Sequence, residues 1–326
     1  MIPNRKSLLD ITLHSRGAFL LGCGGGGDII QTIPVMNYLR RLGVLQFVLG
    51  DYAVKWFDEP GFISMGCEVL PLDSLAPSEL IHPDAALINP DTQINDNKEG
   101  KRILHEAVIA REFGVPTVSI SLAHGAQGVL EAVKEVMNRF SLDLLVTVDI
   151  GADSFYSGEE TSVQSPMTDA ISVYIADQMN GIFALSGYGC DAEIPLAHLD
   201  RNVTRVMQKG GYLGAHGLTP QDVEDLSRVL EYFPGEEVEQ WPRDAALGKL
   251  GMQYCKGLWP IYVTPLAAII LFFNPAMIME VNPLPLALAA TQTLYEAEDT
   301  IMANFNIWPE TRYPIRVKMP SPRQPL

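Results

Sequence analysis

The feature that most constrains this chain is a run of glycines between a short apolar segment and a helix-like segment. Residues Ala18–Leu21 are all apolar, as in a strand that is buried on both faces of a sheet. Residues 28–42 place apolar side chains at helical spacing, and a glycine at position 43 is a usual helix stop. Between the two segments, Gly22, Gly24 and Gly27 have the G-x-G-x-x-G spacing of a phosphate-binding strand–loop–helix unit. The chain is therefore predicted to have an α/β fold.

Short apolar runs alternate with helix-like stretches through about residue 186. This alternation is typical of a parallel sheet with right-handed helical crossovers. We predict a three-layer, Rossmann-like, doubly wound α/β fold with a mainly parallel sheet. The predicted buried parallel strands are Ala18–Leu21, Gln46–Leu49, Ala85–Ile88, Thr117–Ile120, Leu144–Val148 and Ile182–Leu185. The predicted helices are Asp28–Leu42, Lys98–Phe113, Gly125–Phe140 and Pro166–Met179.

The chain after residue 217 is patterned less regularly. We expect one domain, 1–326, with a Rossmann-like core of about 17–217 and a C-terminal helical elaboration of about 218–326. Thr219, directly before Pro220, has the position of a helix N-cap. The predicted C-terminal helices are Leu218–Tyr232, Arg243–Lys256 and Leu284–Asn304, followed by an extended proline-rich arm, Trp308–Leu326.

Composition argues against several classes of partner. The formal charge is −16 and the pI is about 4.7, which does not suit a nucleic-acid backbone or an anionic membrane. Residues 258–279 carry no charge over nearly the length of a membrane span, but three prolines interrupt them. Within them, Ala267–Phe273 is expected to be a buried strand or helix. The four cysteines are widely separated, as isolated thiols are in a reducing compartment. We predict a cytoplasmic protein and leave homo-oligomerisation open.

The glycine-rich loop is the first predicted binding element. Glycines let a phosphate approach the backbone closely, and the following helix N-terminus offers free N–H groups. Asp28 weakens a dinucleotide interpretation, because its charge would repel a phosphate at the helix start. The structural alternative is that Asp28 caps the helix and the glycines make a tight turn. The predicted cofactor-binding residues are Gly22, Gly24, Gly25, Gly26, Gly27, Asp28 and, at the position of an NAD(P) ribose-binding acid, Asp51.

Acidic residues gather after two later predicted strands. They are Asp149, Asp153, Glu159 and Asp169 after the Leu144–Val148 strand, and Asp191 and Glu193 after the Ile182–Leu185 strand. The carboxyl ends of parallel strands share one edge of a sheet, where ligands bind. These loops and the glycine-rich loop are therefore expected to form one acidic cleft. The structural alternative is a set of turns and helix caps.

Three roles are open for these carboxylates. Asp149, Asp153 and Asp191 are predicted to bind Mg²⁺ or Mn²⁺ through their oxygens. The carboxylates can instead bind an amine or a sugar hydroxyl, or supply a general base whose pKa is raised by its neighbours. The predicted catalytic residues are Asp149, Asp153, Glu159, Asp191 and His124, a histidine that follows the Thr117–Ile120 strand. The structural alternative for His124 is a turn histidine bonded to the backbone.

Taken in order, these motifs resemble the family catalogued as domain of unknown function 1152, which occurs mostly in archaea and bacteria. The resemblance spans at least residues 18–217. It implies a Rossmann-like fold and this order of motifs, but no activity. Glycine is usual in the family where this chain has Ala152 and Ala192. The motifs that carry the resemblance are Gly22–Asp28, Val148–Asp153, Gly158–Glu159 with Ser165–Pro166 and Asp169, and Gly187–Glu193.

The sequence favours a small-molecule enzyme that binds a polar or phosphorylated, nucleotide-like ligand at the glycine-rich loop. Asp28 favours metal-assisted transferase, lyase or hydrolase chemistry, because a cation would screen its charge from a phosphate. An NAD(P)-dependent oxidoreductase that uses Asp51 is the second hypothesis. A non-catalytic ligand-binding or assembly protein with the same pocket is the third.

Overall fold

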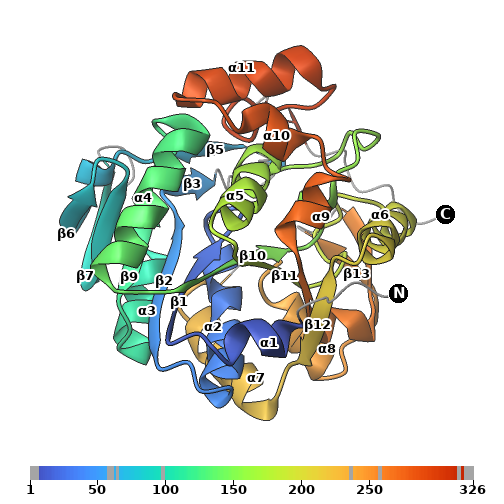
Figure 1. Cartoon of the computed structure of the whole chain (residues 1–326), viewed down its shortest axis with the longest axis horizontal. Coiled ribbons are helices and arrows are strands. Elements are labelled where there is room, and N and C mark those ends of the chain that lie inside the picture. Colours follow the sequence, from blue (N-terminus) through green and yellow to red (C-terminus); the bar gives the residue numbers. More distant parts are fainter. Residues whose placement is uncertain are drawn as a thin grey trace.

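The structure is a computed structural model that describes residues 7–56, 62–63, 66–96, 100–234, 238–255, 259–313 and 317–318. Its centre is a ten-stranded sheet in which five neighbouring strands run parallel, in the order β9-β2-β1-β10-β11 (Figure 1). Counted along the chain, β1 lies in the middle, the next two lie on one side and the last two on the other. The strands are β1 (Gly17–Gly22), β2 (Gln46–Tyr52), β9 (Thr117–Ile120), β10 (Leu144–Ile150) and β11 (Ile182–Ser186).

Antiparallel strands extend this parallel centre on both sides. On the β9 side lie β7 (Ala85–Asp96), β6 (Leu75–His82) and β8 (Gly100–Ile103); on the β11 side lie β15 (Ile269–Phe273) and β12 (Tyr212–Gly217). The prediction that residues 85–88 form a parallel strand is wrong, because β7 runs antiparallel to β9. An apolar run indicates burial, not strand direction, and β7 also pairs antiparallel with β6 and β8.

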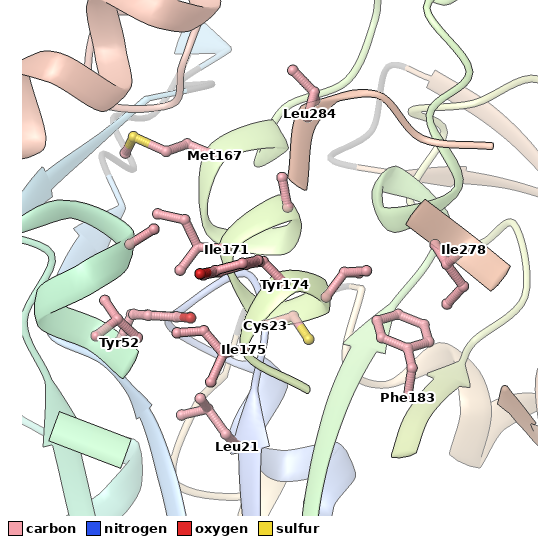
Figure 2. Packing of buried hydrophobic residues seen from close by; sticks show 14 of the residues in the cluster. Leu21, Cys23, Tyr52, Met167, Ile171, Tyr174, Ile175, Phe183, Ile278 and Leu284 are labelled. Atoms are coloured by element: carbon pink, nitrogen blue, oxygen red, sulfur yellow. The ribbon is translucent and has the colours of Figure 1, made fainter. Parts of the chain in front are cut away.

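Helices cover both faces of the sheet and complete three layers. Alternate residues of β1 point to opposite faces of the sheet and pack into two hydrophobic cores. Ala18 and Leu20 pack with α2, and Phe19 and Leu21 pack towards α4 and α5. Figure 2 shows Ile171, Tyr174 and other α5 side chains in the second core. One layer holds α2 (Asp28–Arg41), α3 (His105–Phe113) and α7 (Pro220–Leu230). The other holds α4 (Gly125–Arg139), α5 (Pro166–Gln178), α9 (Pro275–Met279), α10 (Leu284–Leu288) and α11 (Leu294–Asn304).

Smaller elements complete the described chain. The helices are α1 (Leu8–Thr12), α6 (Leu196–Gln208) and α8 (Trp241–Ala246), and the 3₁₀ turns are η1 (Leu72–Ser74), η2 (Asp153–Phe155) and η3 (Pro265–Ala268). Three small two-stranded sheets pair β3 (Val54–Trp56) with β5 (Cys67–Val69), β4 (Phe62–Ile63) with β16 (Val317–Lys318), and β13 (Gly251–Cys255) with β14 (Trp259–Val263).

Several predicted helix boundaries need correction. The helix predicted for 98–113 begins only at His105, because Gly100–Ile103 pairs with β7, and residues 98–99 lie outside the described part. The helix predicted for 243–256 ends at Ala246, after which Gly248 and Gly251 at positive φ turn the chain into β13. The helix predicted for 284–304 is two helices, since Thr293 caps a new one by accepting from Glu296 N.

The chain beyond residue 217 contributes a strand to the sheet as well as helices. Residues 269–273, within the segment expected to be a buried strand or helix, form β15 between β11 and β12. Thr219 caps α7 as predicted, accepting from Asp222 N. Of the arm predicted for 308–326, Glu310 is fully buried, and residues 314–316 and 319–326 lie outside the described part. Among the described residues, no helix combines the length and the apolar character needed to cross a membrane.

A matched pair of leucines tests the sheet core. Leu49 in β2 is fully buried, whereas Leu45, just before β2, is 85% exposed. We expect Leu49→Ala to lower the free energy of unfolding by about 2–5 kcal/mol, because it leaves a cavity between sheet and helices. Leu45→Ala should change it by less than about 0.5 kcal/mol. Urea unfolding measures both, and equal losses would contradict this burial pattern.

Candidate functional site

The glycine-rich loop and the Asp149 loop meet where the strand order reverses. Strand β1 pairs with β2 on one side and with β10 on the other, so the loops after β1 and β10 leave the sheet as neighbours. The crossover after β1 goes to one side and the chain after β10 to the other, which opens the sheet edge between them. Cys23 N also donates to Val148 O, which ties the start of the glycine-rich loop to β10.

The glycines of this loop are required by close packing. Gly25 and Gly26 have φ of +76° and +77°, a conformation that other residues rarely adopt. A Cβ on Gly25 would lie 2.3 Å from Val54 Cγ2, and one on Gly24 would lie 2.6 Å from Asp28 Oδ2. The N–H of Gly24 donates a hydrogen bond to the Asp28 carboxylate. The loop therefore folds around the carboxylate at the start of α2.

Three carboxylates meet at this junction and are called the first carboxylate group: Asp28, Asp149 and Asp169. They come from the start of α2, from β10 and from the first turn of α5, and one oxygen of each lies within 4.8 Å of the others. All three are buried. Burial, and then the charge of Asp153, raises the pKa of Asp149 from 3.8 to about 7. Burial and the charge of Asp149 raise the pKa of Asp28 and of Asp169 well above the usual value.

Asp153, Asp191 and Glu193 form a second carboxylate group with the same spacing, within 4.8 Å. Asp153 begins η2 after β10, and the other two follow β11. Burial and the charge of Asp153 raise the pKa of both Asp191 and Glu193 well above their usual values. Glu193 is partly exposed, so this group is nearer the surface than the first.

A serine links the two groups. Ser165 Oγ lies 2.6 Å from Asp169 Oδ2 and 3.3 Å from Asp153 Oδ2, and its hydroxyl proton can be donated to either oxygen. Ser154 contacts the first group as well, with its N–H 3.4 Å from Asp149 Oδ2 and its hydroxyl 3.4 Å from Asp169 Oδ1. The two groups are therefore parts of one acidic site.

The described residues do not balance the acids of this site with positive charge. In the described part of the chain, none of the six carboxylates forms an ion pair with a lysine, arginine or histidine side chain. An ionised carboxylate taken out of water costs several kcal/mol unless it is paired. Buried acids with no cationic partner must hold protons or bind cations.

Asp51 adjoins the glycine-rich loop but is enclosed. It is only 1% exposed, and its Oδ1 accepts from Tyr52 N at 2.8 Å. Its Oδ2 is buried and accepts no hydrogen bond from the described residues. Burial, and then the charge of Glu106, raises the pKa of Asp51 well above its usual value.

Two predicted catalytic residues lie outside both groups. Glu159 is exposed and pairs with Arg201 at 2.6 Å. His124 precedes α4 and contacts the buried side chain of Asp84. Its Nδ1 lies 2.8 Å from each carboxylate oxygen of Asp84. His124 therefore has a carboxylate partner, not the backbone partner of the structural alternative.

Two glutamates that the sequence did not single out border the site. Glu239 lies over the glycine-rich loop: a Cβ on Gly27 would lie 2.1 Å from Glu239 Oε1. Glu310 is buried and caps the start of α5, next to Asp169, by accepting from the N–H groups of Met167 and Thr168. Glu239 lies more than 200 residues along the chain from its partner, and Glu310 lies more than 140 residues from its partner. Both belong to irregular C-terminal segments, and no local motif marks them.

A family model described as a protein of unknown function, DUF1152, matches residues 19–313. The chain belongs to this family. The match confirms the resemblance seen in the sequence, and it covers the residues of the glycine-rich loop and of both carboxylate groups. No curated protein and no solved structure matches the chain.

The acidic site predicts how the metal-free DUF1152 chain responds to pH. The pKa of Asp149 is higher in the folded chain than in the unfolded one, so the folded state binds more protons between pH 4 and about 7. The free energy of unfolding should therefore fall as pH rises through this window, and Asp149→Asn should flatten the decline. Chemical unfolding in EDTA from pH 5 to 8 measures both slopes.

Carboxylates whose pKa is lowered in the folded chain make the free energy of unfolding rise with pH, but only at lower pH. Hydrogen bonds to Glu160 and Asp222 hold their pKa below the usual value although both side chains are buried, so the stability they add is lost on acidification. A flat or rising stability of the metal-free wild type from pH 5 to 8 would contradict the carboxylate geometry.

Proposed function

We propose that this protein is a metal-dependent small-molecule enzyme in which Asp28, Asp149 and Asp169 bind Mg²⁺ or Mn²⁺. The observation that carries the proposal is that these three buried carboxylates lie within 4.8 Å of one another. Among the described residues, no cationic side chain forms an ion pair with them. Carboxylate oxygens are the ligands that hard divalent cations prefer. A bound cation would replace the protons that otherwise neutralise the group.

The ligand proposed for this cation is a phosphorylated or otherwise anionic small molecule. The site lies at the carboxyl edge of the sheet, at the β1–β10 reversal of strand order, where open α/β sheets bind ligands. Direct phosphate binding on the glycine-rich loop is opposed by Asp28, whose carboxylate already accepts from Gly24 N. A cation between Asp28 and the phosphate would turn this repulsion into attraction. A cation bound there would supply Lewis-acid chemistry, which suits transferase, lyase or hydrolase reactions.

The dinucleotide alternative has weaker support from the geometry. An NAD(P) pyrophosphate needs the free N–H groups of the glycine-rich loop, and Asp28 occupies one of them. The ribose needs an accessible acid after β2, but Asp51 is enclosed, and its Oδ1 already accepts from Tyr52 N. A non-catalytic ligand-binding protein would use the same cation site, and only turnover separates it from an enzyme.

Cation binding tests the proposal through stability. At 100 times its dissociation constant, Mn²⁺ or Mg²⁺ should raise the free energy of unfolding by about 2.7 kcal/mol, because it binds only the folded site. Asp149→Asn and Asp28→Asn should remove the part of this gain that comes from the first carboxylate group. Asp299→Asn, an exposed acid on α11, is the matched control and should retain it. Thermal unfolding at pH 8 with and without EDTA measures each difference.

A ligand panel then separates the functions. With Mn²⁺ present, phosphorylated sugars and nucleotides should add further stabilisation that disappears in Asp149→Asn. Stabilisation by NAD(P) without metal, or equal metal effects in Asp149→Asn and wild type, would overturn the proposal. Ligand binding without turnover of any bound compound would favour the non-catalytic alternative.

A further inference from the structure

The second carboxylate group has the construction of a ligand site in its own right. Asp191 Oδ1 accepts from Glu193 N at 3.1 Å, and Glu193 Oε2 accepts from Gln164 N at 2.6 Å. Asp153 Oδ2 accepts from the same Gln164 N–H at 2.9 Å and from Ser165 N at 2.7 Å. Backbone N–H groups thus fix one oxygen of each carboxylate in the described part of the chain.

The free oxygen of Asp153 is the observation that points to a ligand. Asp153 is 2% exposed, and its Oδ1 is buried without a hydrogen-bond partner in the described chain. A buried carboxylate oxygen left unpaired is costly, so native proteins normally provide it with a donor or a cation. The neighbouring groups that face it, Asp191 and Glu193, are acidic and supply no positive charge.

The backbone approaches this group closely at Gly151 and turns sharply at Ala192. Gly151 has φ of +116°, and a Cβ there would lie 2.0 Å from Asp191 Oδ2. Ala192 adopts φ of +68°, which is rare for a residue with a Cβ, and this turn places the flanking Asp191 and Glu193 in one group.

We propose that Asp153, Asp191 and Glu193 bind a second divalent cation beside the first, so that the site is a two-metal centre. The inference rests on the proposed function of the first carboxylate group. The link between the groups is Ser165, whose hydroxyl contacts Asp153 Oδ2 and Asp169 Oδ2, so these oxygens are no further apart than the sum of the two contacts. Neighbouring hard cations suit a substrate with a bridging oxyanion, and a phosphoryl group is the class that such centres bind.

The number of bound Mn²⁺ ions tests the second site. At pH 8 we expect equilibrium dialysis to find two Mn²⁺ per wild-type chain, one in Glu193→Gln and one in Asp149→Asn. Asp299→Asn, the exposed control on α11, should retain two. In electron paramagnetic resonance, the two ions of the wild type should show magnetic coupling. Each single-site variant should give the spectrum of an isolated Mn²⁺.

Other outcomes each overturn a defined part of the two proposals. One ion in the wild type that survives Glu193→Gln but not Asp149→Asn overturns the second site and leaves the proposed function intact. One ion that survives Asp149→Asn but not Glu193→Gln overturns the first group instead, and no bound ion overturns both. Two uncoupled ions overturn the two-metal centre. Asp191→Asn repeats the test at a second ligand, and circular dichroism in EDTA verifies that each variant is folded.

Discussion

Negative charge buried at the carboxyl edge of β1 and β10 is the constraint on which this structure depends. Asp28, Asp149 and Asp169 share a small volume and have no cationic partner among the described residues. Each ionised member would cost several kcal/mol in desolvation, and each also repels the others. The chain tolerates this arrangement only because protons or cations neutralise it. The elevated pKa of Asp149, about 7, expresses that balance near neutral pH.

The surrounding fold serves this edge in several ways. The reversal of strand order at β1 sends the crossover after β1 to the β2 side and the chain after β10 to the β11 side, so the two loops meet at the sheet edge between them. Gly24 and Gly25 let the loop close on Asp28 and Val54, where any side chain would clash. Ser165 joins the two carboxylate groups, because its N–H is donated to Asp153 and its hydroxyl can be donated to Asp169. The C-terminal part, through Glu239 and Glu310, packs over the loop and the start of α5.

Much of this arrangement could be predicted from local pattern. Apolar runs located the central strands, and Thr219 located the start of α7. The position of acids directly after strands predicted that Asp149, Asp153 and Asp191 would lie at one edge, where the structure brings them together with Asp28. Glu159 has the same sequence context but lies outside, paired with Arg201. The sequence could not show that Glu159 lies outside the site, because the direction of a loop side chain depends on how its turn packs.

By itself, the sequence determined the parallel centre of the sheet, the glycine-rich turn and the excess of acid at its edge, because these follow from periodicity, residue size and charge. The tertiary structure decided strand direction at β7, the insertion of β15 and the division of the acids into two groups. It also decided that Glu310 caps α5. These features depend on contacts between residues far apart in the chain, and no local pattern records the partner that a buried polar group will meet.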